Sequence, residues 1–412
     1  MDKSNEEILN LFDNAQQPFL TDLTKDQDEK VVVVKGRAKV KKKINFDERR
    51  VYAEKAVDIF ETGTIQHQKY AERIRKCAVI LEFGWVGLTA DQLVLKLKSA
   101  YFCRVRNCPV CQWRRSQMWS ARFFEVLPRI FADYPDMRFI FITFTVANCH
   151  VSELRSTVQD MNSGWDRMSR RKKFPALGYV RSLEVTKEKN LYDKSGKNLI
   201  RAARPDYCHP HFHALVAVPA SYFSGRNYLS KDDYAEMWQD GLRVDYKPVV
   251  DVRIVKPKEI LTDGEPLDKQ AAEYEGMKAA LVEVVKYTVK PEDMVDNPEW
   301  FLELVNQLHK TRAVSLGGIF KEYLKVNDDG GLITKEERAG NEGGFMFRFL
   351  PEFQRYRFSH FKNKDSDSVR KPFKDKSKWG RGFYRPFDLF EVPHFCLLSI
   401  RAQCLVIQEL GF

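Results

Sequence analysis

The chain lacks any long hydrophobic run. Among its 412 residues no stretch of about 18 apolar residues occurs, and a membrane-spanning helix requires a run of that length. The first residues, MDKSNEEILN, are polar and acidic and do not have the pattern of a signal peptide. We therefore expect a soluble, cytoplasmic protein that is neither secreted nor bound to a membrane.

Cysteine is also scarce. Eight cysteines in 412 residues are too few for a disulfide scaffold, and the clustering of several of them favours metal binding in a reducing compartment. A phosphate-binding loop of the form GxxxxGKS or GxxxxGKT is missing as well. This absence excludes nucleotide hydrolysis by that kind of loop.

What the chain has in excess is positive charge. Lys and Arg number 68 against 57 Asp and Glu, which gives a net charge of +11. Such a balance favours a polyanionic partner, because cations that neutralise phosphates release the counterions bound to them. With 43% hydrophobic residues the chain can also bury a substantial core, and its length predicts two or three domains.

Composition divides the chain into four segments. We expect a weakly ordered basic arm at 1–50 and a Cys-rich zinc- and DNA-binding segment at 51–131. The catalytic domain is expected at 132–325. A polar, Gly-rich linker and a basic C-terminal extension then occupy 326–412.

Hydrophobic periodicity predicts the architecture of the third segment. Strands with alternating or continuous apolar residues alternate there with helical patterns. The predicted order is strand 138–146, helix 152–171, strand 179–187, strand 211–219, helix 231–239 and strand 249–255, followed by a helix over 269–290. This β-α-β-β-α-β order predicts an α+β fold with a ferredoxin-like antiparallel sheet.

Two histidines on the third predicted strand have the spacing of metal ligands. In HPHFHAL the side chains of His211 and His213 leave the same face of a strand, because strand side chains alternate. The second and third strands form a hairpin, which brings Glu184 of SLEVT beside them as a third ligand. Alternatively, the histidines are hydrogen-bonded polar groups on a half-buried sheet. His209 shares their parity and is expected to be a positioning group.

The last predicted helix carries a second group of polar side chains. Glu283 and Tyr287 lie one turn apart on one face, with Lys286 and Lys290 beside them. A phenol with a pKa near 10 becomes a nucleophile at neutral pH only where cations stabilise the phenolate, and the two lysines could do so. The alternative is an ordinary amphipathic surface helix.

Four cysteines suggest a separate zinc site. Cys103, Cys108 and Cys111 have the spacing C-x4-C-x2-C, and Cys77 upstream is a possible fourth ligand. Four thiolates suit tetrahedral Zn²⁺ in a structural role. The alternative is a set of buried free thiols. Basic stretches at 39–43, 170–173 and 370–385 are candidates for additional contact with DNA, although charge runs are often just solvated surface.

Three blocks in this order resemble the plasmid rolling-circle replication initiators of the His-hydrophobic-His endonuclease superfamily. They are FIFITFTVAN (139–148), HPHFHALV (209–216) and EVVKYTVK (283–290), preceded by CRVRNCPVCQWRRS (103–116). The resemblance spans about 75 to 290. It implies an enzyme that cleaves one strand at a double-strand origin, after which a host DNA polymerase extends the free 3′-hydroxyl. Because the sequence has neither a helicase nor a polymerase signature, a host helicase and a host DNA polymerase are the expected partners.

The resemblance also implies roles for single residues. His211 and His213 match the metal motif, for Mg²⁺ or Mn²⁺, and Glu184 is a further expected ligand. Tyr287 matches the nicking nucleophile, and Glu283 matches the acidic residue that some members use in place of a second tyrosine. Two alternatives remain at this point: a relaxase or transposase of the same superfamily, and a non-catalytic zinc-containing DNA-binding regulator.

Overall fold

The structure is a computed structural model in which the chain forms two compact units. Unit 1 comprises residues 1–51, 76–102 and 333–412, and unit 2 comprises 52–75 and 103–332. Within them the structure describes residues 19–20, 29–34, 37–42, 46–86, 94–193, 195, 197–256, 261–262, 265–266, 269–285, 289, 291–324, 332–333 and 342–361.

Unit 1 is built on a four-stranded antiparallel sheet with the order β16-β15-β3-β4. Its strands are β3 (Ile80–Val86), β4 (Val94–Ala100), β15 (Glu342–Leu350) and β16 (Arg355–Phe361). Strands from two distant parts of the chain therefore pair, because β15 lies against β3. The buried Tyr356 fixes this pairing: its backbone N–H donates to Asp47 and its hydroxyl donates to the carbonyl of Ala78.

A hairpin of β1 (Glu29–Val34) and β2 (Arg37–Lys42) also belongs to unit 1. Helix α4 (Phe46–Glu61) crosses the boundary between the units: residues 46–51 belong to unit 1 and residues 52–61 belong to unit 2. The four segments expected from composition remain a prediction. The structure adds that the described strands of 342–361 share one sheet with those of 80–100.

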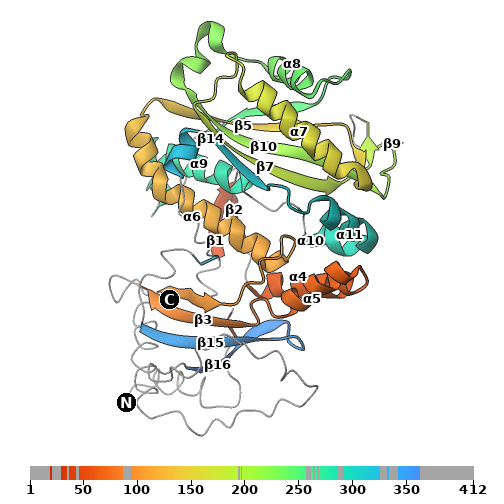
Figure 1. The fold of residues 1–412 in the computed structure, drawn as a ribbon. Coiled ribbons are helices and arrows are strands. Elements are labelled where there is room, and N and C mark those ends of the chain that lie inside the picture. Colours follow the sequence, from red (N-terminus) through yellow and green to blue (C-terminus); the bar gives the residue numbers. More distant parts are fainter. Residues whose placement is uncertain are drawn as a thin grey trace. The chain divides into compact units, whose positions relative to one another are not determined.

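Unit 2 contains a sheet with the order β11-β5-β10-β7-β14, in which all neighbours are antiparallel (Figure 1). Its strands are β5 (Met137–Thr145), β7 (Gly178–Lys187), β10 (Tyr207–Pro219), β11 (Val250–Ile254) and β14 (Val314–Gly318), and the short β6 (Cys149–His150) pairs with β10. The apolar, β-branched and aromatic composition of β5, β7 and β10 suits strands covered on both faces. The third predicted strand thus lies at the centre of the sheet.

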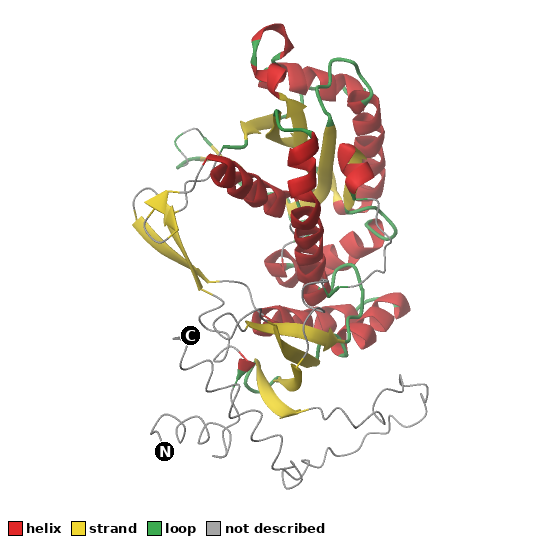
Figure 2. Ribbon diagram, turned by 90° about the vertical axis from the view of Figure 1, so that its left-hand side faces the viewer, coloured by secondary structure: helices red, strands yellow, loops and turns green. Residues whose placement is uncertain are grey.

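One face of this sheet is covered by α7 (Leu154–Ser169) and α8 (Lys231–Leu242). Trp165 of α7 and Trp238 of α8 both pack against Phe144 and Phe212, which project from β5 and β10 to this side. Figure 2 shows the strands of unit 2 enclosed between helices. Helix α8 begins with a capping box formed by Ser230 and Asp233, which satisfies the free N–H groups of its first turn.

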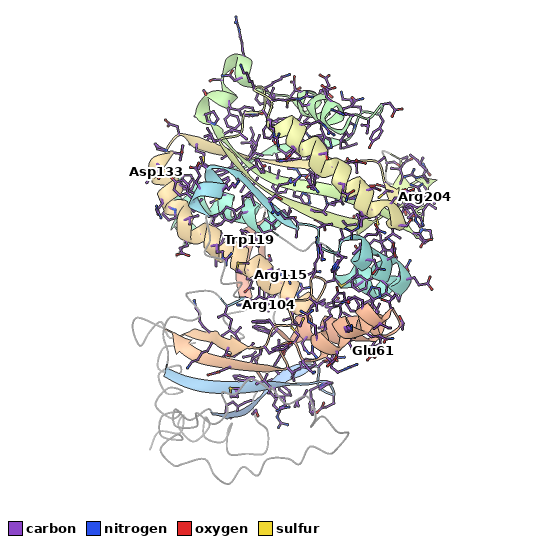
Figure 3. The ribbon with its side chains drawn as sticks, viewed as in Figure 1. Glu61, Arg104, Arg115, Trp119, Asp133 and Arg204 are labelled. Carbon is purple, nitrogen blue, oxygen red and sulfur yellow. The ribbon has the colours of Figure 1, made fainter. Side chains whose placement is uncertain are left out.

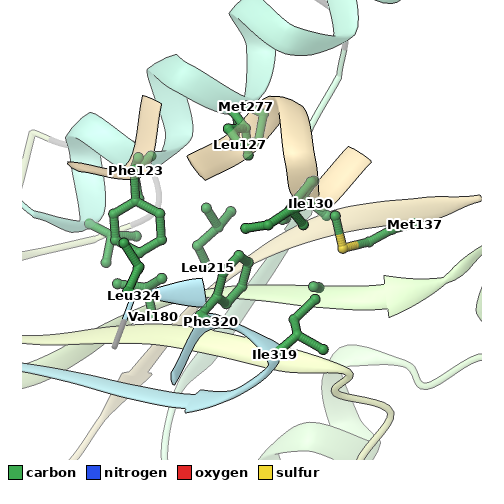
Figure 4. Close-up of a cluster of buried hydrophobic side chains, with 14 of the residues drawn as sticks. Phe123, Leu127, Ile130, Met137, Val180, Leu215, Met277, Ile319, Phe320 and Leu324 are labelled. Carbon is green, nitrogen blue, oxygen red and sulfur yellow. The ribbon is translucent and has the colours of Figure 1, made fainter. Parts of the chain in front are cut away.

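The opposite face is covered by α6 (Pro109–Asp133), α9 (Lys269–Val284) and α12 (Ile319–Tyr323). Leu215 and Val180 on the sheet form one buried cluster with apolar residues of all three helices (Figure 4). The helical members are Phe123, Leu127, Ile130, Met277, Leu281, Val284, Val285, Ile319, Phe320 and Leu324. Burial of so much apolar surface is the main force that holds these helices on the sheet.

The remaining elements of unit 2 are short. They are α5 (Ile65–Arg75), α10 (Pro291–Asp296), α11 (Pro298–Gln307), the 3₁₀ turns Val151–Glu153, Ala220–Phe223 and Gly225–Asn227, and two hairpins. One hairpin is formed by β8 (Leu191–Tyr192) and β9 (Leu199–Arg201), and the other by β12 (Leu261–Thr262) and β13 (Glu265–Pro266). Among the described residues, no helix is both long and apolar enough to cross a membrane.

The α+β class predicted from the sequence is confirmed, and so is the chain order of strands and helices β5, α7, β7, β10, α8 and β11. The strand β14 next to β7 was not predicted. The helix expected over 152–171 begins at Leu154, because a 3₁₀ turn with the imidazole of His150 as its cap precedes it. The last predicted helix is shorter than expected, since α9 ends at Val284.

Candidate functional site

Glu184, His211 and His213 converge on one face of the central sheet. His211 is the direct cross-strand partner of Glu184, and His213 lies two residues further along β10 on the same face. Glu184 Oε2 is 3.0 Å from His213 Nε2 and 3.6 Å from His211 Nε2. Potential ligand atoms of all three residues lie within 4.8 Å of one another. The sequence predicted this set, and the structure brings it together.

The geometry of this group fits a divalent ion. Two ligand atoms at neighbouring positions about 2.1 Å from an octahedral ion lie about 3.0 Å apart, close to the separations found between Glu184 and the two imidazoles. One carboxylate and two imidazoles leave coordination positions for substrate oxygens. The residues present therefore fit a divalent metal ion but do not identify it.

Burial and the two histidines have opposite effects on the Glu184 carboxyl. Burial acts to raise its pKa, but hydrogen bonds from His211 and His213 and their charge outweigh burial, so the pKa lies well below its ordinary value. The carboxylate is thus ionised at neutral pH. An ionised carboxylate beside two imidazoles is the state that binds a cation.

Two further contacts orient the imidazole rings. Thr143 on β5 faces His213 across the sheet, and its Oγ1 lies 3.1 Å from His213 Nδ1. His211 Nδ1 lies 3.2 Å from the backbone carbonyl oxygen of His209. In both rings Nδ1 is engaged and Nε2 points toward Glu184. Such outer contacts fix the ring orientation that a metal ligand requires.

A chain of polar side chains, of which only Glu188 is fully buried, leads away from these histidines. His209 Nδ1 lies 2.7 Å from Asn148 Oδ1, and the Asn148 amide donates to the carboxylate of Glu188 at 2.8 Å. Glu188 also accepts hydrogen bonds from the guanidinium groups of Arg201 and Arg204. The hydrogen bonds and charge of Arg204, with the Asn148 bond, outweigh burial and hold the pKa of Glu188 below its ordinary value.

Helix α9 lies on the same face of the sheet as the three converging side chains. Its buried residues Met277, Leu281 and Val284, together with Val285 just after the helix, pack with Leu215 and Val180. These two residues share the strand parity of His213 and Glu184. Glu283 is exposed, on the side of α9 away from this cluster. The predicted side chains Lys286, Tyr287 and Lys290 lie outside the described residues.

The four predicted cysteines also form a group. Cys77 follows α5, Cys103 and Cys108 precede α6, and Cys111 lies in the first turn of α6. All four are buried and unpaired by disulfides, and their sulfur atoms lie within 4.8 Å of one another. The Arg104 backbone N–H donates to Cys111 Sγ at 3.3 Å, as suits a thiolate acceptor.

This cluster fits a tetrahedral zinc ion. Sulfur atoms about 2.3 Å from a tetrahedral ion lie about 3.8 Å apart, and the observed separation between Cys103 and Cys111 is 3.6 Å. A disulfide would need about 2.0 Å. Cys208, by contrast, has the properties of a buried free thiol. Burial raises the pKa of its thiol to about 12, and among the described residues Cys208 belongs to no group of potential metal ligands.

Comparison with known proteins gives the family. A family model described as replication protein matches residues 94–356. "Protein rep" of Streptococcus pneumoniae serotype 2 (strain D39 / NCTC 7466) is 34% identical over 289 residues, covering 68% of this chain and 79% of the relative. "Protein rep" of Lactiplantibacillus plantarum is 33% identical, covering 63% and 76%. A "Replication protein" of Staphylococcus aureus is 29% identical, covering 56% and 94%.

The chain belongs to the replication protein family. The resemblance to plasmid replication initiators is thereby confirmed. No solved structure matches the chain.

The structure describes side-chain contacts for one of the basic stretches proposed for DNA contact in this replication protein, residues 170–173. Arg170, Arg171 and Lys173 each form an ion pair, with Asp166, Asp240 and Asp233 respectively, at 2.8 to 3.0 Å. Their charge is therefore largely balanced locally. Residues 370–385 lie outside the described residues. Near α6, the Arg115 guanidinium donates to the carbonyls of Arg104 and Arg106, so it braces the cysteine-bearing loop (Figure 3).

Sequence reasoning overlooked three polar residues of this replication protein. Thr143, Asn148 and Glu188 all contact the histidine motif directly or through one intermediate. A signal existed for Thr143, because it shares the strand parity of Thr145 within a block otherwise rich in apolar residues. No local pattern marks Glu188, whose partners lie 13 to 40 residues away.

Proposed function

We propose that this replication protein starts rolling-circle replication of a plasmid by nicking one DNA strand at the double-strand origin. Tyr287 would be the nucleophile, and the products would be a 5′-phosphotyrosine and a free 3′-hydroxyl. The observation that carries the proposal is the convergence of Glu184, His211 and His213 on the sheet face covered by α9, in a chain of the replication protein family.

The three converging residues would bind the metal ion that contacts the scissile phosphate. Glu184 supplies the ionised carboxylate, and the rings of His211 and His213 are oriented by their Nδ1 contacts. A bound Mg²⁺ or Mn²⁺ would polarise the phosphate and offset the negative charge that develops on it. Because these side chains project from paired strands, their positions are set before DNA binds.

The path of the chain on either side of Tyr287 supports its role. Met277 of α9 lines a cavity with Met137 and Phe139, at the end of the sheet where β10 finishes. On the far side of Tyr287, the ring of Trp300 lies 5.5 Å from the ammonium of Lys187, at the opposite end of the sheet. Met277 and Trp300 thus lie near opposite ends of β7 and β10, and the converging residues lie between these ends.

The proposed chemical step exchanges one phosphodiester bond for another. The phenolate oxygen of Tyr287 attacks phosphorus, the bond to the 3′ oxygen breaks, and that oxygen takes up a proton. No external energy source is needed, which agrees with the missing phosphate-binding loop. Lys286 and Lys290 would favour the phenolate by their charge.

Glu283 would act later in the reaction. It precedes Tyr287 by one helical turn in sequence and is exposed at the end of α9. As a general base it could activate a water for hydrolysis, or a 3′-hydroxyl for strand transfer. An enzyme that ends its round in this way with one tyrosine would be used once for each replication event.

The proposed system has further parts. A host helicase would open the duplex, since the sequence has no phosphate-binding loop of the form GxxxxGKS or GxxxxGKT, and a host DNA polymerase would extend the 3′-hydroxyl. The four-cysteine cluster would hold Zn²⁺ and stabilise the start of α6.

A covalent adduct is the decisive test. The full chain is incubated with single-stranded origin DNA and Mg²⁺ or Mn²⁺, and the adduct is separated on a denaturing gel. Tyr287→Phe should bind the DNA but give no adduct, and His211→Ala together with His213→Ala should lower adduct yield at least about a hundredfold. Tyr228→Phe, which changes another tyrosine that is exposed, is the matched control.

The outcomes separate the rival functions. A zinc-containing DNA-binding regulator would bind the DNA and form no adduct in its wild-type form. An unchanged adduct yield in Tyr287→Phe would assign the nucleophile to another of the 16 tyrosines. Mass spectrometry of the DNA-linked peptide would then identify that tyrosine.

A further inference from the structure

A two-stranded hairpin lies within the connection between β7 and β10. Strands β8 and β9 pair with each other, with Leu191 opposite Arg201 and Tyr192 opposite Leu199. Figure 1 shows β9 past the end of the sheet of unit 2. The tip is held by Asp193, whose Oδ1 accepts the N–H groups of Ser195 and two further residues of the turn. The hairpin is thus a formed element rather than an open loop.

The hairpin exposes four large apolar side chains. Leu191 is 49% exposed, Tyr192 46%, Leu199 53% and Ile200 64%. A hairpin of so few residues pairs its backbone but gives these side chains no layer to pack against. Clusters of exposed apolar residues of this kind commonly mark surfaces that bind a partner.

Charge identifies the kind of partner. Residues 187–204 contain six Lys and Arg against two Asp and Glu. Both acids are already engaged, Glu188 with Arg201 and Arg204, and Asp193 within its own turn. A second copy of this hairpin would meet a like-charged surface. A polyanion that also offers flat apolar faces, as unpaired or splayed bases do, complements both properties.

The root of the hairpin is joined to the histidine motif. Glu188, buried at the end of β7, binds Arg201 and Arg204 on the returning strand and accepts from Asn148, which contacts His209. Arg204 marks this root in Figure 3. The hairpin therefore has a fixed direction relative to Glu184, His211 and His213.

We propose that the β8–β9 hairpin is a DNA-contacting element that engages origin DNA on one side of the nick site. Tyr192 and the neighbouring apolar side chains would stack on bases, and the surrounding cations would contact phosphates. The proposal deepens the proposed function, since it rests on the chain binding origin DNA at the histidine motif. Leu191 lies seven residues beyond Glu184, so the chain can separate the two by at most about 23 Å. Contact is thus expected within about seven nucleotides of the scissile phosphate.

Binding without nicking tests the hairpin directly. Fluorescence anisotropy of a fluorescein-labelled DNA stem-loop is measured with the full chain in the absence of added divalent ions. A variant carrying Tyr192→Ala and Leu199→Ala should raise Kd about tenfold, since a stacked base commonly contributes a five- to hundredfold difference. Tyr192→Phe keeps the ring and should retain wild-type affinity.

A matched control uses another exposed apolar residue of unit 2. Ile65 is 73% exposed at the start of α5, and Ile65→Ala should leave Kd unchanged. Lys189→Gln with Lys197→Gln should reduce the slope of log Kd against log salt by about two, because each lysine would neutralise one phosphate. Circular dichroism shows whether each variant keeps its fold, and the exposed positions make loss of folding unexpected.

The outcomes keep this inference separate from the nicking chemistry. Equal Kd values for the wild type and the Tyr192/Leu199 double variant would overturn the hairpin's role, as would wild-type protein that does not bind the stem-loop. A weaker-binding double variant, together with wild-type protein that forms no covalent adduct, would support the hairpin and overturn the nicking function. If the hairpin instead binds a protein partner, the double variant should have the same Kd for the stem-loop as the wild type.

Discussion

Glu184 and His211 stand directly opposite each other on β7 and β10, with Glu184 Oε2 3.6 Å from His211 Nε2. The cross-strand register alone produces this approach, because paired residues on antiparallel strands project to the same face. His213 joins them from the next position on that face, at 3.0 Å. The orientation of the His213 ring is therefore central to this group of side chains, and the first prediction concerns the residue that contacts its other nitrogen.

The first prediction concerns Thr143, which contacts His213 Nδ1 at 3.1 Å. Thr143→Val keeps the side-chain shape but removes the hydroxyl that orients the imidazole, so affinity for Mn²⁺ should fall about ten- to hundredfold. Isothermal titration calorimetry measures this affinity. Thr143→Ser should restore most of it.

The control for that experiment is Thr145→Val. The Thr145 hydroxyl donates to the carbonyl of Val249 and does not bond an imidazole, although Thr145 lies opposite His211. Its loss should leave Mn²⁺ affinity nearly unchanged. An equal decrease in both valine variants would show that Thr143 acts only through general packing of the sheet.

The second prediction concerns Glu188. Glu188→Gln should lower the free energy of unfolding at neutral pH by about 2 kcal/mol, because hydrogen bonds to a charged group are replaced by neutral ones. Urea unfolding followed by fluorescence measures the difference. Asp240→Asn, which breaks only the exposed pair with Arg171, should cost at most about 1 kcal/mol.

The difference in unfolding free energy between the wild type and Glu188→Gln should depend on pH. The pKa of Glu188 is lower in the folded protein than in the unfolded chain, so its contribution is fully present above the unfolded pKa of about 4.3. That contribution is lost as the pH falls through the folded pKa. The stability gap between wild type and Glu188→Gln should therefore be constant above about pH 5 and narrow in acid. A gap that widens in acid would contradict the lowered pKa.

The third prediction concerns the cysteine cluster. The chain should contain one zinc per molecule, and replacement by Co²⁺ should produce the intense absorption of thiolate ligands. Cys108→Ser should weaken metal binding and reduce the thermal stability of the protein, because metal binding contributes folding free energy. Cys208→Ser is the control, since Cys208 is buried but outside the cluster. Zinc content unchanged in Cys108→Ser would contradict the site.

The fourth prediction separates the two halves of the proposed reaction. Glu283→Gln should leave the rate of the first nick within about twofold and slow the terminating step at least about a hundredfold, because only that step needs a general base. Single-turnover assays with labelled strands resolve the two steps. Equal loss of both would show that Glu283 instead supports the fold or the nucleophile.

Local pattern was enough to predict much of the fold. Alternating and continuous apolar runs predicted β5, β7, β10 and β11, because burial of side chains with a period of two is a local property of the sequence. The same period placed His211 and His213 on one face.

Long-range pairing escaped prediction. The sheet formed by β3, β4, β15 and β16 joins segments some 250 residues apart, and β14 adds to the edge of the central sheet. Strand periodicity says which face is buried but not which strand is the neighbour, and register depends on contacts across the whole unit. For the same reason the sequence missed Thr143, which meets His213 only because β5 and β10 pair in one register.

By itself, then, the sequence determined the kinds of chemistry available: two imidazoles on one strand face, a carboxylate on the adjoining strand, four grouped cysteines and a basic chain of a replication family. The tertiary structure decided which of these groups meet. It oriented the rings through Thr143 and His209, tied His209 through Asn148 to Glu188, and formed an exposed hairpin within the connection between β7 and β10. Hydrogen-bond geometry requires positions fixed to within tenths of an ångström, and only the packed and paired strands supply that precision.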